Sequence, residues 1–262
     1  MKQIRFYLYL LLVNFYCLTS ISQDMDVYYT CYYNTALPKI IPATLQIKKN
    51  ISVFEEHFDK RREWNNGNDI FKDLNLNDVE HYRGKKRTEL NSYIQRDINN
   101  KTIFIIDFIG TKNFLIEDVF LELDWNLTND KKIISSYECR RAETNFRGLK
   151  WVVWFAPEIN TVFGPWKLYG LPGLILEAYD ENKKYHFLAE KIVLNSSSDL
   201  YFPKDKLQTI SIKEAVKDQI KKREAINAHI SRGEINIGDK YKLESMEPHY
   251  EWENEQIEST KK

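Results

Sequence analysis

The amino-acid sequence predicts a mainly β protein, an antiparallel meander folded as a sandwich or as a partly open barrel-like sheet, with a C-terminal helix. Three observations predict this fold class. Runs of strand-forming residues recur over the first three quarters of the 262 residues. Short polar turns separate these runs, as expected between neighbouring antiparallel strands. After residue 210 the apolar residues change to a four-residue spacing, which is typical of a helix that faces a core.

The expected strands are runs of β-branched and aromatic residues between polar turns. They comprise 26–33, 44–47, 51–54, 92–96, 102–108, 113–116, 125–127, 132–144, 148–156, 174–179 and 185–194. The run at 148–156 has apolar residues at both parities, so we expect it to be covered on both faces. We expect it to form a hairpin with 132–144 through Asn145-Phe146-Arg147.

One helix is expected at 211–230, where Ser211 and Glu214 have the spacing of a capping box. The residues from 55 to 86 are rich in charge, Asn and Gly, which favours a surface excursion. The expected divisions of the chain are a β-rich domain at 23–207 with a polar insertion at 55–86, a helical appendage at 208–237, and a polar tail at 238–262 that is expected to fray.

The first 22 residues have the order of a secretory signal peptide. Lys2 and Arg5 precede an apolar run, and small polar residues lead to Ser22. The apolar run is interrupted at Asn14 and is shorter than the roughly 20 residues that span a bilayer, which disfavours the alternative of a retained anchor. We expect cleavage before Gln23 and export through the inner membrane, to a periplasmic or secreted location.

Charge and cysteine content narrow the class of protein further. The 38 basic and 38 acidic residues balance, which gives no electrostatic reason to expect nucleic acid as a partner. Cys17 leaves with the signal peptide, so Cys31 and Cys139 remain. In an oxidising compartment these two can form one disulfide, and the alternative is two buried thiols packed as small apolar residues.

A series of motifs between residues 118 and 194 resembles the GLPGLI family of exported bacterial envelope proteins. The resemblance is carried by Asp124-Trp125, Tyr137-Glu138-Cys139-Arg140-Arg141-Ala142, Trp151, Trp154-Phe155, Pro157-Glu158-Ile159, and the signature Gly164-Pro165-Trp166-Lys167-Leu168-Tyr169-Gly170-Leu171-Pro172-Gly173-Leu174-Ile175. It implies an exported, β-rich protein of bacteria with two membranes. The family has no assigned activity, so the resemblance implies no catalytic residue.

The signature is built for one sharply turned conformation, since Pro fixes φ and Gly accepts positive φ. Two interpretations stay open. In the first, the loop locks one hairpin onto the next and its apolar side chains fill the core. In the second, it is a rigid rim that presents Trp166 and Tyr169 to a ligand or partner.

No catalytic or metal-binding pattern stands out. The histidines lack the paired spacing of metal ligands, and no nucleophile elbow or zinc-protease helix is present in the sequence. We therefore expect no metal and no cofactor. The abundant aromatic residues favour a non-catalytic envelope binding or carrier module for an apolar ligand. One alternative is an accessory protein that docks on an outer-membrane transporter or secretion partner, and another is a hydrolase with an unrecognised site.

Overall fold

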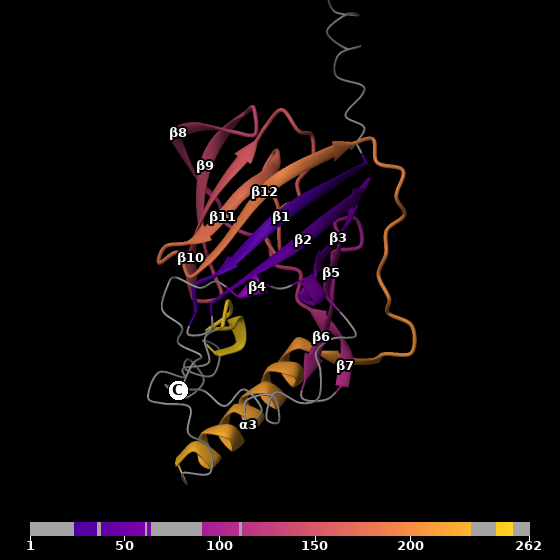
Figure 1. The fold of residues 1–262 in the computed structure, drawn as a ribbon, viewed down its shortest axis with the longest axis vertical. Helices are drawn as coiled ribbons and strands as arrows, with labels where there is room; N and C mark the ends of the chain where they lie inside the picture. The colour runs from indigo at the N-terminus through magenta and orange to yellow at the C-terminus, as the bar shows by residue number, and fades with distance from the viewer. Residues whose placement is uncertain are drawn as a thin grey trace, which may run out of the picture.

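The computed structural model describes residues 24–35, 38–60, 62–63, 91–109, 112–231 and 245–253. The expected signal peptide, the cleavage site before Gln23, most of the insertion at 55–86 and most of the tail at 238–262 lie outside these residues. The described strands form one mostly antiparallel sheet in the order β13-β7-β6-β5-β3-β2-β1-β12-β11-β10-β9-β8, and β4 pairs with β2. The expected mainly β fold with one helix near the C-terminus is confirmed, and the sheet is open (Figure 1).

The elements follow the expected strands closely. They are β1 (Met25–Tyr33), β2 (Lys39–Lys48), β3 (Ile51–Glu56), η1 (Phe58–Lys60), β4 (Arg62–Glu63), β5 (Ser92–Asp97), β6 (Thr102–Ile109), β7 (Lys112–Asp118), β8 (Asn126–Ile134), β9 (Tyr137–Phe146), β10 (Leu149–Ala156), β11 (Leu174–Asp180), β12 (Tyr185–Leu194), β13 (Gln208–Ser211) and α3 (Ile212–Ser231).

Two meanders make the sheet. Strands β1, β2, β3, β5, β6 and β7 pair in that order along the chain, and so do strands β8 to β12. The meanders join where β1 pairs with β12, with Met25 opposite Leu194 and Tyr33 opposite Tyr185. The middle of the sheet is therefore a contact between the start of the described chain and a strand far along the sequence.

The sheet curls until its two ends approach each other. Eight strands lie between β7 and β9 in the sheet, yet Asp118 at the end of β7 is hydrogen-bonded to Arg147 in the turn after β9 at 2.7 Å. Buried apolar residues of both meanders belong to one core, together with the loop between β10 and β11. The fold is thus a partly open, barrel-like sheet (Figure 1), and the loop contributes Trp166, Leu168 and Leu171 to its core.

The expected strand at 132–144 was wrong, because two strands occupy this stretch. Ser135 and Ser136 both have positive φ, 48° and 76°, and they turn β8 back onto β9. Two successive positive φ values are typical of the tight turn whose twist suits a hairpin, although this turn lacks the usual Asn or Gly. The next turn has the same geometry at Arg147 and Gly148, two residues later than the centre of the expected loop.

The helix confirms its sequence signal, whereas the strand before it was missed. The backbone NH of Ser211 donates to Glu214 at 2.8 Å and that of Glu214 donates to the Ser211 hydroxyl at 3.2 Å, which is the expected capping box. β13 pairs in parallel with β7, so the sheet continues past the expected domain boundary at residue 207. Within the described part of the chain, no helix has the length and apolarity needed to cross a membrane.

Candidate functional site

The signature loop lies inside the curled sheet. Trp166, Leu168, Leu171 and Leu174 are all buried in the main core, which confirms the interpretation that these side chains fill it. The loop is tied to its own ends, since the NH of Gly170 donates to Val162 O at 2.7 Å. The loop is therefore part of the core, and its packing positions the side chains of the candidate site, including Trp166 and Lys167.

Two glycines of the signature are required by close contacts. A Cβ on Gly164 would lie 2.7 Å from side-chain atoms of Ile175, and a Cβ on Gly173 would lie 2.3 Å from Ala156 O. Gly173 also has φ of 149°. The motif therefore reflects a backbone pressed against its neighbours, and only glycine leaves the space that this approach needs.

A buried arginine outside the signature holds the loop in place. Arg96 on β5 donates to Gly164 O at 2.7 Å, to Leu168 O at 2.9 Å and to the Ser52 hydroxyl at 3.0 Å. Its side chain is fully buried, and burial lowers the pKa of Arg96 to about 10. Each of the three nitrogens of the guanidinium thus donates one hydrogen bond, and the two carbonyls fix the central turn of the loop.

The expected contact residues Trp166 and Tyr169 are not on an exposed rim, since they are 4% and 5% exposed. The Tyr169 hydroxyl donates to Leu121 O, and its carbonyl accepts from the Trp125 indole at 2.9 Å. Trp166 has φ of 52° and lies 5.2 Å, ring centre to ring centre, from Trp151. A bulky residue in the left-handed region stores strain that the surrounding packing must hold.

Trp166 lines a cavity of about 270 Å³ between the sheet, α3 and the C-terminal segment 245–253. The apolar part of the wall comes from β5, β6, β7 and α3, and includes Ile94, Ile105, Ile116, Ile212 and Ala215. The polar part includes Lys39, Glu56, Asp107, Lys167 and Glu247. The surface of the cavity is therefore mixed, with the isoleucines and Trp166 beside charged and polar groups, and more of it is polar than apolar.

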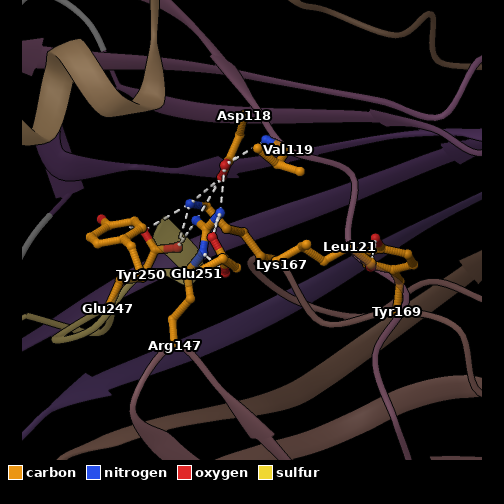
Figure 2. Close-up of polar contacts among 9 residues, drawn as sticks. All are labelled: Asp118, Val119, Leu121, Arg147, Lys167, Tyr169, Glu247, Tyr250 and Glu251. Carbon is orange, nitrogen blue, oxygen red and sulfur yellow. Dashed lines mark hydrogen bonds and ion pairs between the residues drawn. The ribbon is translucent and has the colours of Figure 1, made fainter. Parts of the chain in front are cut away.

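Beside this cavity lies a buried cluster of charges, shown in Figure 2. Asp118 accepts two hydrogen bonds from Arg147, at 2.7 and 2.9 Å, and one from Lys167 at 2.7 Å. Glu247 accepts from Lys167 through both carboxylate oxygens, at 2.7 and 2.8 Å, and also from Arg147. Glu251 completes the cluster by accepting from Arg147 at 2.9 Å. We call these five residues the ion cluster.

The electrostatics of the ion cluster favour the charged forms. Burial by itself would raise the pKa of Asp118, but the positive charges of Lys167 and Arg147 lower it below its ordinary value of 3.8. Burial would likewise lower the pKa of Arg147, but Asp118 and Glu247 raise it above its ordinary range. The side chains of Arg147, Lys167 and Asp118 are at most 3% exposed, so these charges are held by one another.

The ion cluster fastens the segment 245–253 to the sheet, although the sequence predicts a fraying tail there. A Cβ added to Gly148 would lie 2.6 Å from the His249 ring and 2.9 Å from Pro248. The Tyr250 ring lies 4.8 Å from the Arg147 guanidinium and stacks on Trp252. This part of the tail is therefore ordered by aromatic, steric and ionic contacts.

Cys31 and Cys139 are both free and buried, so of the two possibilities left open by the sequence the structure has two buried thiols and not the disulfide. Burial raises the pKa of the Cys139 thiol to about 11 and that of Cys31 well above its ordinary value. Cys139 donates to Tyr137 O at 3.6 Å. A raised pKa leaves little thiolate at neutral pH, which argues against a cysteine nucleophile.

A second polar group lies on strands β8, β11 and β12. Glu177 contacts His186 at 2.9 Å and pairs with Lys132, and burial, which would raise its pKa, is outweighed by these two partners, so the pKa is lowered. Lys132 lies 4.3 Å above the Trp154 ring, and His186 stacks on Tyr32. The partners of His186 are a carboxylate and aromatic rings, and nothing in these contacts supplies a nucleophile.

Among the described residues, no group of three or more His, Cys, Asp or Glu side chains is placed to hold a metal ion. The sequence patterns predicted neither Arg96 nor the ion cluster as site residues. They did single out the signature loop, which both contact. One usable signal was present. Lys167 is the only charged residue in the stretch 159–176, and a lysine in such a setting is expected to be paired when buried.

No family model and no curated protein match the chain. Among solved structures, two of PNGF-II, in P21 and C2 crystals, each align with a TM-score of 0.51 and 13% identity over 77% of this chain. They are matched over 34% and 33% of their own length, so the chain spans about a third of the PNGF-II chains. At this identity the likeness shows the fold alone.

Two further structures are more distant. An uncharacterized conserved protein from Thermus thermophilus aligns with a TM-score of 0.39 and 9% identity, over 73% of this chain and 92% of its own. A putative outer membrane lipoprotein-sorting protein domain from Vibrio parahaemolyticus aligns with a TM-score of 0.19 and 8% identity, over 67% and 87%. Scores this low support no conclusion about this chain.

Proposed function

We propose that the chain is an exported binding or carrier module of the bacterial envelope, without catalytic activity, for a small ligand with apolar surface. The observation that carries the proposal is the cavity of about 270 Å³ between the curled sheet and α3. A concave, largely preformed site with an apolar wall and a few polar groups is the usual form of a small-molecule site.

The structure of the cavity wall supports binding. Ile94, Ile105 and Ile116 project from three adjacent strands, and α3 adds Ile212 and Ala215 from the opposite side. Trp166 adds an aromatic ring from the signature loop, two of whose carbonyls accept from Arg96. Preformed aromatic surface favours binding, because little side-chain freedom is lost when the ligand arrives.

The charged side chains of the wall support a non-catalytic role. Lys167 is committed to Asp118 and Glu247, and the Tyr33 hydroxyl donates to Glu56. Lys39 lies over the Tyr33 and Phe58 rings. A general base or nucleophile must be able to reach a substrate, whereas these groups are engaged by neighbouring side chains.

The proposal of export rests on the sequence, through the signal-like first 22 residues. The family resemblance, carried by the signature at 164–175, is part of the same proposal, and the tight packing of Gly164 and Gly173 gives that signature a physical reason. Mass spectrometry of the N-terminus of the secreted or periplasmic protein should find Gln23 first. A retained Met1 would contradict export by cleavage.

The binding proposal is tested with N-phenyl-1-naphthylamine, an uncharged apolar dye whose fluorescence rises in apolar surroundings. We expect saturable binding to the full chain. Val216→Trp should abolish it, because Val216 lines the cavity from α3 and the larger ring would fill the space. Ile220→Trp is the matched control, since Ile220 lies one turn further along α3, is exposed, and is not part of the cavity wall.

Equal dye binding by the native chain and Val216→Trp would show that the cavity is not the binding site. Turnover of a panel of p-nitrophenyl esters by the native chain, lost in Val216→Trp, would instead favour the hydrolase alternative. In both experiments the circular dichroism spectrum of the variant must match that of the native chain. A loss of dye binding or of ester turnover then reports on the cavity and not on unfolding.

A further inference from the structure

We propose that Arg147 and Lys167 form a carboxylate-binding site at the margin of the cavity, that Glu247 fills this site in the structure described here, and that the ligand is an apolar molecule with one carboxylate. The inference rests on the proposed function, because it names the chemical class of the molecule that enters the same cavity.

The contacts of Glu247 have the geometry of a bound carboxylate. One of its oxygens lies 2.7 Å from the Lys167 ammonium and also accepts from Arg147, and the other lies 2.8 Å from Lys167 (Figure 2). Tyr250 adds a longer hydrogen bond to the second oxygen at 3.4 Å. Such charge-assisted bonds to both carboxylate oxygens are the strong and specific ones.

The charges around Lys167 favour an anion at this position. Arg147 and Lys167 are buried with Asp118, which compensates one of the two positive charges. Glu247 compensates the second. Glu251 lies at the outer side of Arg147 and is 36% exposed, so solvent screens it more than Glu247, which is 12% exposed. Without Glu247, Lys167 would keep only Asp118, which Arg147 also uses, so a second carboxylate beside the buried ammonium is favourable.

Glu247 comes from a separate segment and faces the cavity. Ser245, Met246 and Glu247 line it together with Trp166 and Lys167. By contrast, Asp118, Arg147 and Lys167 come from the end of β7, the turn after β9 and the signature loop, and they are bonded to one another independently of the segment. A ligand carboxylate that enters past Trp166 therefore meets Lys167 where Glu247 now lies, and it can replace Glu247 without leaving a buried charge unpaired.

The size of the cavity limits the apolar part of the ligand. A volume of about 270 Å³ lies just below the usual range of small-molecule sites, about 300 to 1,000 Å³. A short saturated chain fits this volume. Octanoate is therefore a suitable probe, and 1-octanol has the same chain without the charge.

The test measures binding of octanoate and 1-octanol to the full chain by isothermal titration calorimetry. In Glu247→Gln the competing charge is removed but the shape is kept, so we expect octanoate to bind at least tenfold more tightly than to the native chain. Binding of 1-octanol should be unchanged. Glu253→Gln is the control, because Glu253 lies in the same segment and pairs with His249 at the surface, and it should behave as the native chain does.

The outcomes separate the two proposals. Equal affinities for octanoate in the native chain and Glu247→Gln, with 1-octanol or the dye still bound, would overturn the carboxylate site and leave the cavity as a binding site. Failure of 1-octanol, octanoate and the dye alike would overturn both. Lys167→Met in the Glu247→Gln background should lose the gain for octanoate, and retention of that gain would also contradict the assignment.

Discussion

The guanidinium of Arg96 donates to the carbonyl oxygen of Gly164 at 2.7 Å, and through it β5 holds the loop between β10 and β11. The two residues belong to different meanders. Because a second bond reaches Leu168 O at 2.9 Å, the arginine spans the whole turn that carries Trp166. The conformation of the signature loop thus depends on a side chain that is 68 residues away in sequence.

Replacing Arg96 by Met should destabilise the fold by about 2 to 4 kcal/mol, because three buried acceptors lose their donor. Urea unfolding followed by tryptophan fluorescence measures this change. Arg140→Met is the matched control, since Arg140 is exposed on β9 and its loss should change the free energy of unfolding by less than about 0.5 kcal/mol. Equal losses in the two variants would show that the loop does not need the buried guanidinium.

Two glycines of the signature should differ sharply in their tolerance of a methyl group. Gly173→Ala should cost roughly 2 to 4 kcal/mol, since its Cβ would lie 2.3 Å from a backbone oxygen, and Gly173→Val should cost at least as much. Gly170 has φ of 98°, but its nearest contact is 3.6 Å away. Gly170→Ala should therefore cost only backbone strain, roughly 1 kcal/mol, and thermal unfolding would reveal the order of the two.

The ion cluster predicts a stability that falls in acid. Because the pKa of Asp118 is lowered in the folded chain, its charge stabilises the fold above the ordinary carboxyl range, and this contribution is lost as the pH falls through the lowered pKa. Asp118→Asn should be less stable than the native chain at pH 6 by roughly 3 to 5 kcal/mol. Its stability should also change less between pH 6 and pH 3. Parallel pH profiles of unfolding would contradict this role.

The two buried thiols should resist modification until the chain unfolds. We expect iodoacetamide at pH 8 to leave Cys31 and Cys139 unmodified in the folded chain and to modify both in urea, without prior reduction. Peptide mass spectrometry identifies each site. A requirement for reductant before either cysteine reacts in urea would show that the disulfide forms.

The strands were predictable where a single chain segment carries the signal. The β-branched and aromatic runs in β1 to β3, β5 to β7 and β10 to β12, and the capping box before α3, depend on neighbours within a few residues. The turn at Ser135–Ser136 was missed because tight-turn backbones are usually marked by Asn or Gly, and here two serines take positive φ. β13 was missed because its four residues form a strand only through their pairing with β7.

The candidate site was harder to predict than the fold, because its members converge only in three dimensions. Asp118, Arg147 and Glu247 are separated by 29 and 100 residues, and each is one of many charged residues in the sequence. Trp166 was named from the signature, yet its burial against Trp151 depends on how the sheet curls. Local patterns specify strands and turns, whereas the pairing of distant charges follows from the closure of the fold.

The pairing of β1 with β12 has a consequence for how the chain reaches this fold. The middle of the sheet is complete only when Met25 of β1 pairs with Leu194 of β12. This contact closes a loop of about 170 residues. Contacts between such distant residues slow folding, and until they form, one edge of β1 is an unpaired strand edge that other chains can pair with. A chain synthesised from its N-terminus must keep that edge covered or apart from other copies until β12 is available.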